Sequence, residues 1–202
     1  MSPRAQADAL IGVINSESYL DGNAVRIKDH IVDSLVSKYG EVSDGQWNWF
    51  EKYLTYGNSR IPEALFEAHK SNDAAESPVA KIAKESMEFL TKTLFIGGKF
   101  VPIGQEKWYF KEKTRGMYDQ QPIEASGMTL AYLKAFEKTG NSGYMQKARG
   151  TFDWFLGKNS ANQVVYDEAT GGCFDGITRS GVNANEGAES TISYLLARLS
   201  IA

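Results

Sequence analysis

Three places along this 202-residue chain carry the same device, a glutamate followed by a small residue at the start of an apolar helical pattern. The glutamates are Glu63, Glu124 and Glu189, which are 61 and 65 residues apart. A period of this size fits one helical hairpin plus a long loop, the unit of α-helical arrays that bury their inner helices by stacking or by closing into a ring. In such an array the loops before the helices lie at one end, where loops on a rigid scaffold commonly hold the functional residues.

The spacing of apolar residues predicts a mainly helical chain. Helices are expected over about 24–38, 59–70, 79–94, 122–138 and 144–156. A long loop is expected over 158–184, and a last helix follows it. The last helix carries one apolar face, formed by Ile192, Leu195, Leu196 and Leu199. A short β-hairpin-like excursion is expected near 95–110, with Gly97 and Gly98 as its tight turn. We therefore expect an all-α fold in a single domain over 1–202, with N-terminal helices in 1–40 and repeated helical hairpins with long loops in 41–202.

The composition argues against several kinds of partner. A net charge of -3 and a pI near 5.5 leave no clustered basic face for nucleic acid. No apolar run approaches the roughly 18 residues of a membrane span, and the N-terminus lacks a signal-peptide pattern, so we expect a cytoplasmic protein. With one cysteine, Cys173, and two histidines, His30 and His69, the sequence predicts no metal site, no Ser-His-Asp triad and no cofactor.

Four motifs resemble a known protein region. They are DQQPIEA at 119–125, the stretch 148–157 that ends in WFLG, GGCFDG at 171–176 and NANEGAEST at 183–191. Over roughly 47–202 the chain is similar to the helical region at the C-terminal end of some bacterial and archaeal family 4-type glycosyltransferases. That region resembles the α/α-toroid, or six-hairpin glycosidase, superfamily. The resemblance implies a partial α/α toroid that acts on or binds a saccharide at its loop-bearing end.

The resemblance implies acid and base chemistry by carboxyl groups. Cleavage of a glycosidic bond needs two of them, about 5 Å apart for retention or roughly 6.5 to 9.5 Å apart for inversion. Asp119 or Asp175 is expected as the base that activates water, because each lies in a loop, and Glu124 or Glu189 as the proton donor. Capping and the helix dipole explain a glutamate in a first helical turn equally well, and the dipole lowers its pKa. Asp175 precedes a glycine, which is also a common turn.

Amide side chains before the helices are candidate saccharide contacts. Gln120 and Gln121 precede a proline, where they serve no strong capping purpose, and their amides suit bidentate contacts with pairs of hydroxyl groups. Asn183 and Asn185 can also bind hydroxyls, although asparagine tolerates left-handed turns as well. Glu186 belongs to the same candidate set, and its spacing from Asn183 also matches a capping box.

Aromatic side chains collect in the same loops. Tyr56, Trp108 and Tyr118 can offer a flat apolar ring to the C–H face of a sugar, or they can close the mouth of a helical array. Arg60 lies beside Tyr56 in the weaker first copy of the repeated motif and joins the candidate contacts. Cys173 is expected to pack as a small apolar residue.

The chain also departs from a full toroid. It shows about three helical hairpins where a full toroid has six, and it lacks the strand-helix alternation of a nucleotide-sugar-binding half. The expected partner is a saccharide or glycan, with a homo-oligomer or a glycosyltransferase as further possibilities. The alternative function is a non-catalytic helical accessory or assembly module, and the sequence leaves open whether the chain is an enzyme.

Overall fold

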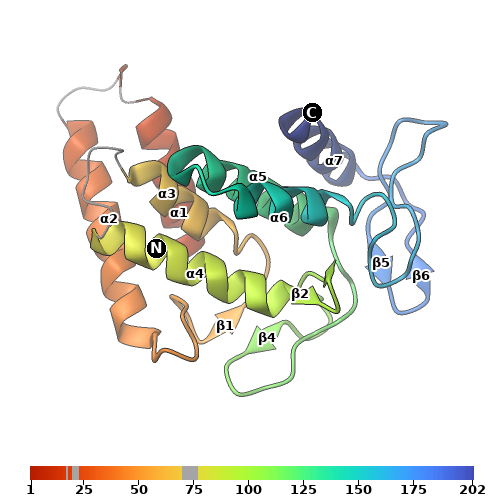
Figure 1. Ribbon diagram of the computed structural model, residues 1–202, viewed down its shortest axis with the longest axis horizontal. Coiled ribbons are helices and arrows are strands. Elements are labelled where there is room, and N and C mark those ends of the chain that lie inside the picture. Colours follow the sequence, from red (N-terminus) through yellow and green to blue (C-terminus); the bar gives the residue numbers. More distant parts are fainter. Residues whose placement is uncertain (17, 20–22, 70–76) are drawn as a thin grey trace. The chain divides into compact units, whose positions relative to one another are not determined.

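A computed structural model describes residues 1–16, 18–19, 23–69 and 77–202 (Figure 1). About 53% of the described residues are helical, with seven helices and three short antiparallel strand pairs in these ranges, which confirms the mainly helical prediction. No helix in the described ranges is long and apolar enough to cross a membrane. The chain divides into an N-terminal unit, residues 1–52 with 58–90, and a C-terminal unit, residues 53–57 with 91–202. The single domain and the toroid stay predictions.

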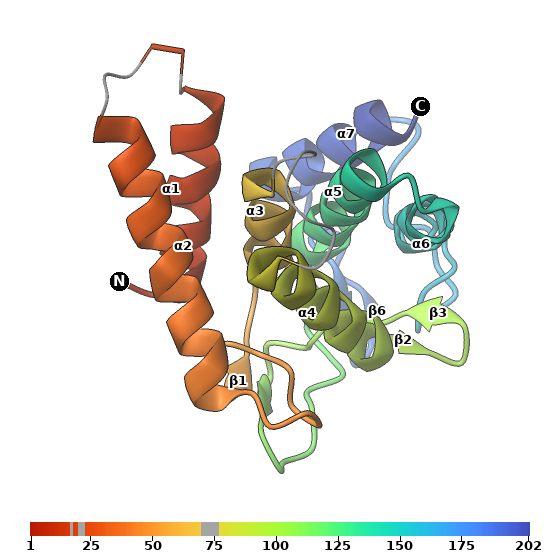
Figure 2. The same ribbon diagram turned by 60° about the vertical axis from the view of Figure 1, so that its left-hand side comes forward.

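The N-terminal unit is built on helix α1. This helix spans Pro3–Asn15 and begins at Ser2, whose hydroxyl accepts a hydrogen bond from the Ala5 backbone N–H at 3.3 Å. It packs against α2 (Asn23–Val42) and α3 (Arg60–Ala68), and Figure 2 shows α1 and α2 side by side. Helix α2 covers the predicted helical range 24–38 and continues to Val42.

Two tryptophans close the other end of this unit. Trp47 and Trp49 are buried, although they lie in a segment without regular structure. Their rings lie 5.0 and 6.1 Å from the ring of Phe89 in α4 (Pro78–Leu94), and the Trp47 indole N–H donates to the Glu51 carbonyl at 2.7 Å. These aromatic residues therefore belong to the core of the N-terminal unit.

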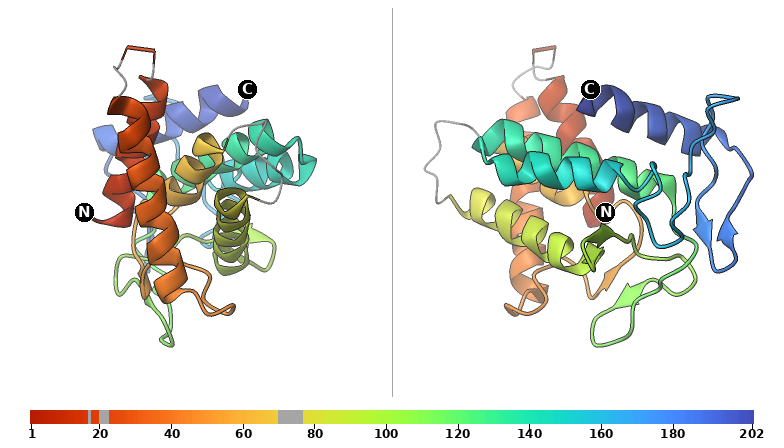
Figure 3. Two further views of the ribbon diagram at one scale, coloured as in Figure 1. Left: turned by 90° about the vertical axis from the view of Figure 1, so that its left-hand side faces the viewer. Right: turned by 45° about the vertical axis from the view of Figure 1, so that its right-hand side comes forward.

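The C-terminal unit is built on helix α5. This helix, Pro122–Thr139, packs against α6 (Ser142–Phe152) on one side and α7 (Ala188–Ile201) on the other. Figure 3 shows the three helices side by side. The α5–α6 hairpin was predicted from the sequence, and this prediction is confirmed. The fully buried Trp154 and Phe155 follow α6 and fill the core beneath it.

Short strand pairs connect the loops of the C-terminal unit. β2 (Phe95–Ile96) and β3 (Lys99–Phe100) form the predicted hairpin, in which Gly97 and Gly98 have φ of 57° and 80°, as a type I′ turn requires. β1 (Tyr53–Leu54) pairs with β4 (Tyr109–Phe110), and β5 (Ile177–Thr178) pairs with β6 (Gly181–Val182).

A half-buried arginine fastens the loop after β4 to these elements. The Arg115 guanidinium donates hydrogen bonds to the backbone carbonyls of Thr93, Val101 and Pro102. Burial lowers its pKa to about 10. The charge of Arg115 therefore holds three backbone carbonyls together.

Helix α7 buries the face opposite to the one that its apolar pattern predicts. The predicted apolar face is 44 to 76% exposed, and it consists of Ile192, Leu195, Leu196 and Leu199. The buried residues are small ones, Ser190, Ser193 and Ala197. Small side chains permit a close approach of α7 to α5, whose buried positions include Ala125, Ala131 and Ala135. The spacing identifies an apolar stripe, but it does not determine which face of the helix is covered.

This packing predicts contrasting effects at two adjacent positions of α7. Replacing the half-exposed Leu196 by serine is expected to change the free energy of unfolding by less than about 0.5 kcal/mol. Replacing the fully buried Ala197 by leucine is expected to cost about 1–3 kcal/mol, because the α5–α7 contact has no room for the added carbons. Urea unfolding of both variants tests this, and the reverse order of effects would show that α7 is turned the other way.

Candidate functional site

The segments that lead into α5 and α7 meet at one end of the C-terminal unit. Figure 3 shows both helices beginning at the end where β5 and β6 lie. Gln120 and Ile177 exchange both backbone hydrogen bonds, at 2.9 and 3.0 Å. Gly176 lies so close to this bridge that a Cβ there would overlap the Gln120 carbonyl oxygen. Two of the three repeated helix starts therefore do lie together, as the period predicted.

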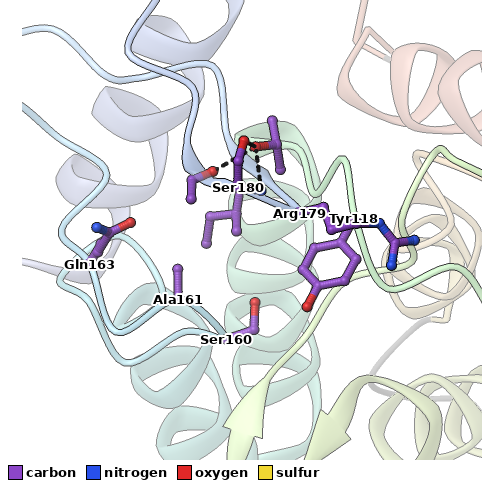
Figure 4. Close-up of a pocket in the computed structure, with 9 residues that line it drawn as sticks. Tyr118, Ser160, Ala161, Gln163, Arg179 and Ser180 are labelled. Atoms are coloured by element: carbon purple, nitrogen blue, oxygen red, sulfur yellow. Dashed lines mark hydrogen bonds between the residues drawn. The ribbon is translucent and has the colours of Figure 1, made fainter.

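An open pocket of about 280 Å³ lies beside this bridge. Its walls come from three segments, and they consist of Tyr118, then Ser160, Ala161 and Gln163, then residues 177–181. Figure 4 shows the Tyr118 hydroxyl pointing to the Ser160 side of the pocket. The floor is held by Gln163, whose amide oxygen accepts a hydrogen bond from the Val182 N–H at 3.2 Å.

A charged pair braces one wall of the pocket. The Arg179 guanidinium carbon lies 4.8 Å from the centre of the Tyr118 ring, and its Nη2 is 2.6 Å from Oε2 of Glu106. A hydrogen bond from the Met117 N–H and the pairing with Arg179 lower the pKa of Glu106. The Tyr118 ring is therefore held in place by Arg179, whose charge is neutralised by Glu106.

The lining presents hydroxyl and amide groups. Ser160, Thr178, Ser180 and Gln163 all carry neutral polar side chains, and the Thr178 and Ser180 hydroxyls are 3.0 Å apart. Arg179 is the charged residue of the lining, and its guanidinium is paired with Glu106. Groups that both donate and accept hydrogen bonds beside an aromatic ring suit a neutral ligand with many hydroxyls.

The two predicted glutamine contacts lie in different surroundings. Gln120 is fully buried, and its amide donates to the Met117 carbonyl and the Ser160 hydroxyl, both at 2.8 Å. Its amide oxygen accepts a hydrogen bond from the Trp154 indole at 3.1 Å. Gln120 therefore lies outside the pocket lining and holds the lining residue Ser160 in place. Gln121 is half-buried at the start of α5 and makes no capping bond with its side chain.

Asp175 is committed to the start of α7. Its carboxylate accepts hydrogen bonds from the Ser190 hydroxyl at 2.6 Å, the Gly187 N–H at 2.8 Å and the Asn185 side-chain amide. The bond from Ser190 is the largest cause that lowers the pKa of Asp175, followed by those from Asn185 and Gly187. A carboxylate whose oxygens already accept three hydrogen bonds is held at the start of α7, so it is not free to activate water as the predicted base.

The lowered pKa of Asp175 predicts a pH-dependent loss in Asp175→Asn. At pH 7 the variant should be less stable by about 1–3 kcal/mol, because an amide accepts with one oxygen and turns an N–H₂ group toward donors. A depressed carboxyl pKa adds stability above the unfolded value near 3.8, and this stability is lost as the pH falls through the folded value.

Urea unfolding at pH 7, 5 and 3 measures this effect. The gap between wild type and Asp175→Asn should hold from pH 7 to 5 and shrink at pH 3. As a control, Asp153→Asn removes an exposed ion pair to Lys158 and should cost no more than about 1 kcal/mol. An equal gap at all three pH values would show that the Asp175 charge does not hold α7.

The other three predicted catalytic carboxyl groups differ in burial and in hydrogen bonding. Glu124 is buried in the first turn of α5 and accepts a hydrogen bond from the Gly57 N–H. Glu189 is exposed in the first turn of α7 and has no hydrogen-bond partner in the described ranges. Asp119 is half-buried at a left-handed φ of 55°, and its carboxylate likewise contacts no hydrogen-bonding group among the described residues.

The repeated glutamates are therefore not equivalent. Glu63, in the N-terminal unit, pairs with Arg60 at 2.7 Å, whereas Glu124 binds a backbone N–H and Glu189 faces solvent. Arg60 also pairs with Asp8 at 2.9 Å, which places this predicted saccharide contact in the ion-pair network of the N-terminal unit. The similar sequence at the three helix starts does not produce similar bonding.

The loop before α7 is exposed but ordered by its own contacts. The predicted capping box of Asn183 and Glu186 does not form, because α7 begins later, with Gly187 as its N-cap, and Asp175 binds that residue from across the loop. Asn183 instead accepts a bond from the Asn185 N–H at 3.2 Å, and Glu186 accepts one from the Thr170 hydroxyl at 2.9 Å.

The remaining aromatic candidates are not part of the pocket lining. Tyr56 and Trp108 form a ring pair with centroids 6.0 Å apart, beside the β1–β4 ladder. Cys173 is buried, and burial raises the pKa of its thiol to about 12, in agreement with its expected packing role.

Sequence reasoning missed the residues that form most of the pocket wall. Ser160, Gln163 and Arg179 were not candidates, although Arg179 lies within a polar, glycine-spaced stretch of the loop before α7. That stretch was a usable signal, because a β-hairpin with polar residues at its tip often reaches a functional surface.

Comparison with known proteins adds no relative: no protein-family model matches the chain, and no curated protein matches it.

Proposed function

We propose that the C-terminal unit binds a saccharide in the pocket beside Tyr118 and does not hydrolyse it. The pocket lining carries the proposal, because it combines an immobilised aromatic ring with hydroxyl and amide groups and a single, already paired charge. Sugar recognition uses this combination, in which the ring packs against C–H groups and the neutral polar groups bind hydroxyls. The resemblance to the helical region of family 4-type glycosyltransferases and to α/α toroids supports the same class of ligand.

The bonding of the acidic residues favours binding over hydrolysis. Of the candidate bases, Asp175 caps a helix, and of the candidate acids, Glu124 binds the Gly57 N–H and Glu189 faces solvent. A hydrolase requires a protonated donor and a free base on opposite sides of one bond. Asp119 and Glu189 have no hydrogen-bond partner in the described ranges, but none of the four candidate carboxylates lines the pocket beside Tyr118.

A glycan-array screen paired with a hydrolysis assay on the same sugars tests the proposal. Wild type should bind at least one glycan without turnover, and Tyr118→Ala should weaken that binding by about tenfold or more, since the loss of 1.4 kcal/mol is tenfold. Tyr19→Ala, which removes a 90% exposed tyrosine of the N-terminal unit, should bind as wild type does. Absence of binding to every glycan would overturn the proposal.

A second candidate function is assembly, and the exposed apolar face of α7 favours it. Contiguous exposed apolar side chains often mark an interaction surface, and α7 exposes Ile192, Leu195, Leu196 and Leu199. A second copy of the chain that completes a ring, or a glycosyltransferase partner, would cover this face. Light scattering of wild type and Leu195→Glu distinguishes the first case: a mass above the monomer that the variant loses supports self-association, and a monomeric wild type contradicts it.

A further inference from the structure

A second aromatic surface lies on the β1–β4 ladder of the C-terminal unit. We call it the aromatic platform, and it consists of Tyr53, Tyr56, Trp108 and Phe110. Tyr53 and Phe110 are cross-strand partners with ring centroids 5.9 Å apart, and Tyr56 and Trp108 form the neighbouring pair at 6.0 Å. Tyr56 is 55% exposed and Phe110 47% exposed, whereas Leu54 on the other side of the ladder is fully buried.

Trp108 is held on this platform in a strained conformation. Its φ is 54°, a left-handed value that is unfavourable for a bulky residue. Three backbone hydrogen bonds maintain it: Trp108 N–H to the Gly104 carbonyl at 3.1 Å, Gly116 N–H to the Trp108 carbonyl at 2.6 Å, and Gly104 N–H to the Gly116 carbonyl at 3.0 Å. Strain that the surroundings maintain in this way is typical of residues placed for binding.

A short segment of chain connects the platform to the pocket wall. Glu106 is two residues before Trp108, so their Cα atoms are at most about 7 Å apart. The Glu106 N–H donates to the Tyr118 carbonyl at 3.4 Å, and its carboxylate holds Arg179 over the Tyr118 ring. One short segment, residues 104–108, therefore runs from the platform to the pocket wall.

We infer that the ligand of the pocket is an oligosaccharide, with one end in the pocket and further sugar units stacked on the aromatic platform. This inference rests on the proposed function and adds the length of the ligand. Aromatic faces bind the C–H faces of sugar rings, and the platform repeats that chemistry outside the pocket. The Glu106–Arg179 ion pair lies between the two surfaces, so a purely apolar ligand that covered both would desolvate it at a cost, whereas sugar hydroxyls can hydrogen-bond to it.

The test is an array that displays each glycan chain at one, two and four sugar units. Wild type should bind the four-unit form of its ligand about tenfold more tightly than the one-unit form. Trp108→Ala and Tyr56→Ala should each lose most of this gain and keep the affinity for one unit, whereas Tyr118→Ala should lose both. Tyr56→Ala matters because its side chain is largely exposed, so the variant should fold even if Trp108→Ala does not. Tyr19→Ala is the control with an unchanged profile.

The outcomes separate the two claims. Equal affinity for all lengths, or a length gain that Tyr56→Ala and a folded Trp108→Ala both retain, overturns the oligosaccharide inference and leaves the pocket proposal standing. Failure of wild type to bind any glycan overturns both. Binding of an apolar or peptide ligand that the platform variants abolish assigns the platform to another ligand and also overturns the inference.

Discussion

Replacing Gln120 by leucine is expected to lower the free energy of unfolding by about 3 kcal/mol, since each buried polar group left without a partner costs about 1–3 kcal/mol. Leucine has nearly the same size and would keep the packing. It would leave the Trp154 indole N–H and the Met117 carbonyl, both partners of the Gln120 amide, without their hydrogen bonds.

Gln121→Leu is the matched control for this prediction. It makes the same change at the next residue, where the side chain is half-buried and makes no capping bond, so the free energy of unfolding should change by about 0.5 kcal/mol or less. Urea unfolding of both variants, followed by tryptophan fluorescence, measures the difference. Equal midpoints would mean that the Gln120 amide is not a buried structural group, and the prediction of a saccharide contact at this position would regain support.

Gly176→Ala should be at least as damaging. Gly176 has φ of 124°, which L-residues rarely adopt, and a Cβ there would overlap the Gln120 carbonyl oxygen. The backbone strain alone costs of order 1–3 kcal/mol. The overlap adds about 1–3 kcal/mol, because the Gln120–Ile177 bridge must open to relieve it. We therefore expect a loss of several kcal/mol and, with it, a distorted pocket.

Gly181→Ala separates the two causes. Gly181 has nearly the same φ, 122°, but the nearest neighbour of an added Cβ is the flexible end of Gln163, at 3.2 Å. The free energy of unfolding of Gly181→Ala should fall only by the contribution from backbone strain. Thermal and urea unfolding of both variants compare them directly. If Gly181→Ala is as unstable as Gly176→Ala, the close approach of the two segments at Gln120 is not what holds this end of the unit together.

Local patterns predicted the local structure well. The α5–α6 hairpin and the Gly97-Gly98 turn follow from spacing and glycine chemistry within a short stretch of chain, and both formed as expected. The apolar stripe of α7 was identified correctly, but its exposure was not, because burial depends on the neighbouring helix. The buried face of α7 has small residues and therefore gives no strong hydrophobic signal.

The site was less predictable because its bonds join distant residues. Asp175 caps a helix that begins thirteen residues later, and the acidic residue inside that helix, Glu189, plays no such part. Gln120 and Gln121 are adjacent and chemically identical, yet one is fully buried and the other is half-buried. Nothing in their local sequence distinguishes them, because the Trp154 side chain that fixes Gln120 comes from 34 residues away.

The most direct test of the central claim is one NMR sample that contains the wild-type chain and the glycan that binds it most tightly on the array. Binding broadens the glycan resonances, and hydrolysis creates new anomeric signals as free reducing ends form. We predict broadening that Tyr118→Ala abolishes and no new anomeric signal. New anomeric signals that disappear in Asp119→Asn would contradict a binding function and would show that the chain is a hydrolase.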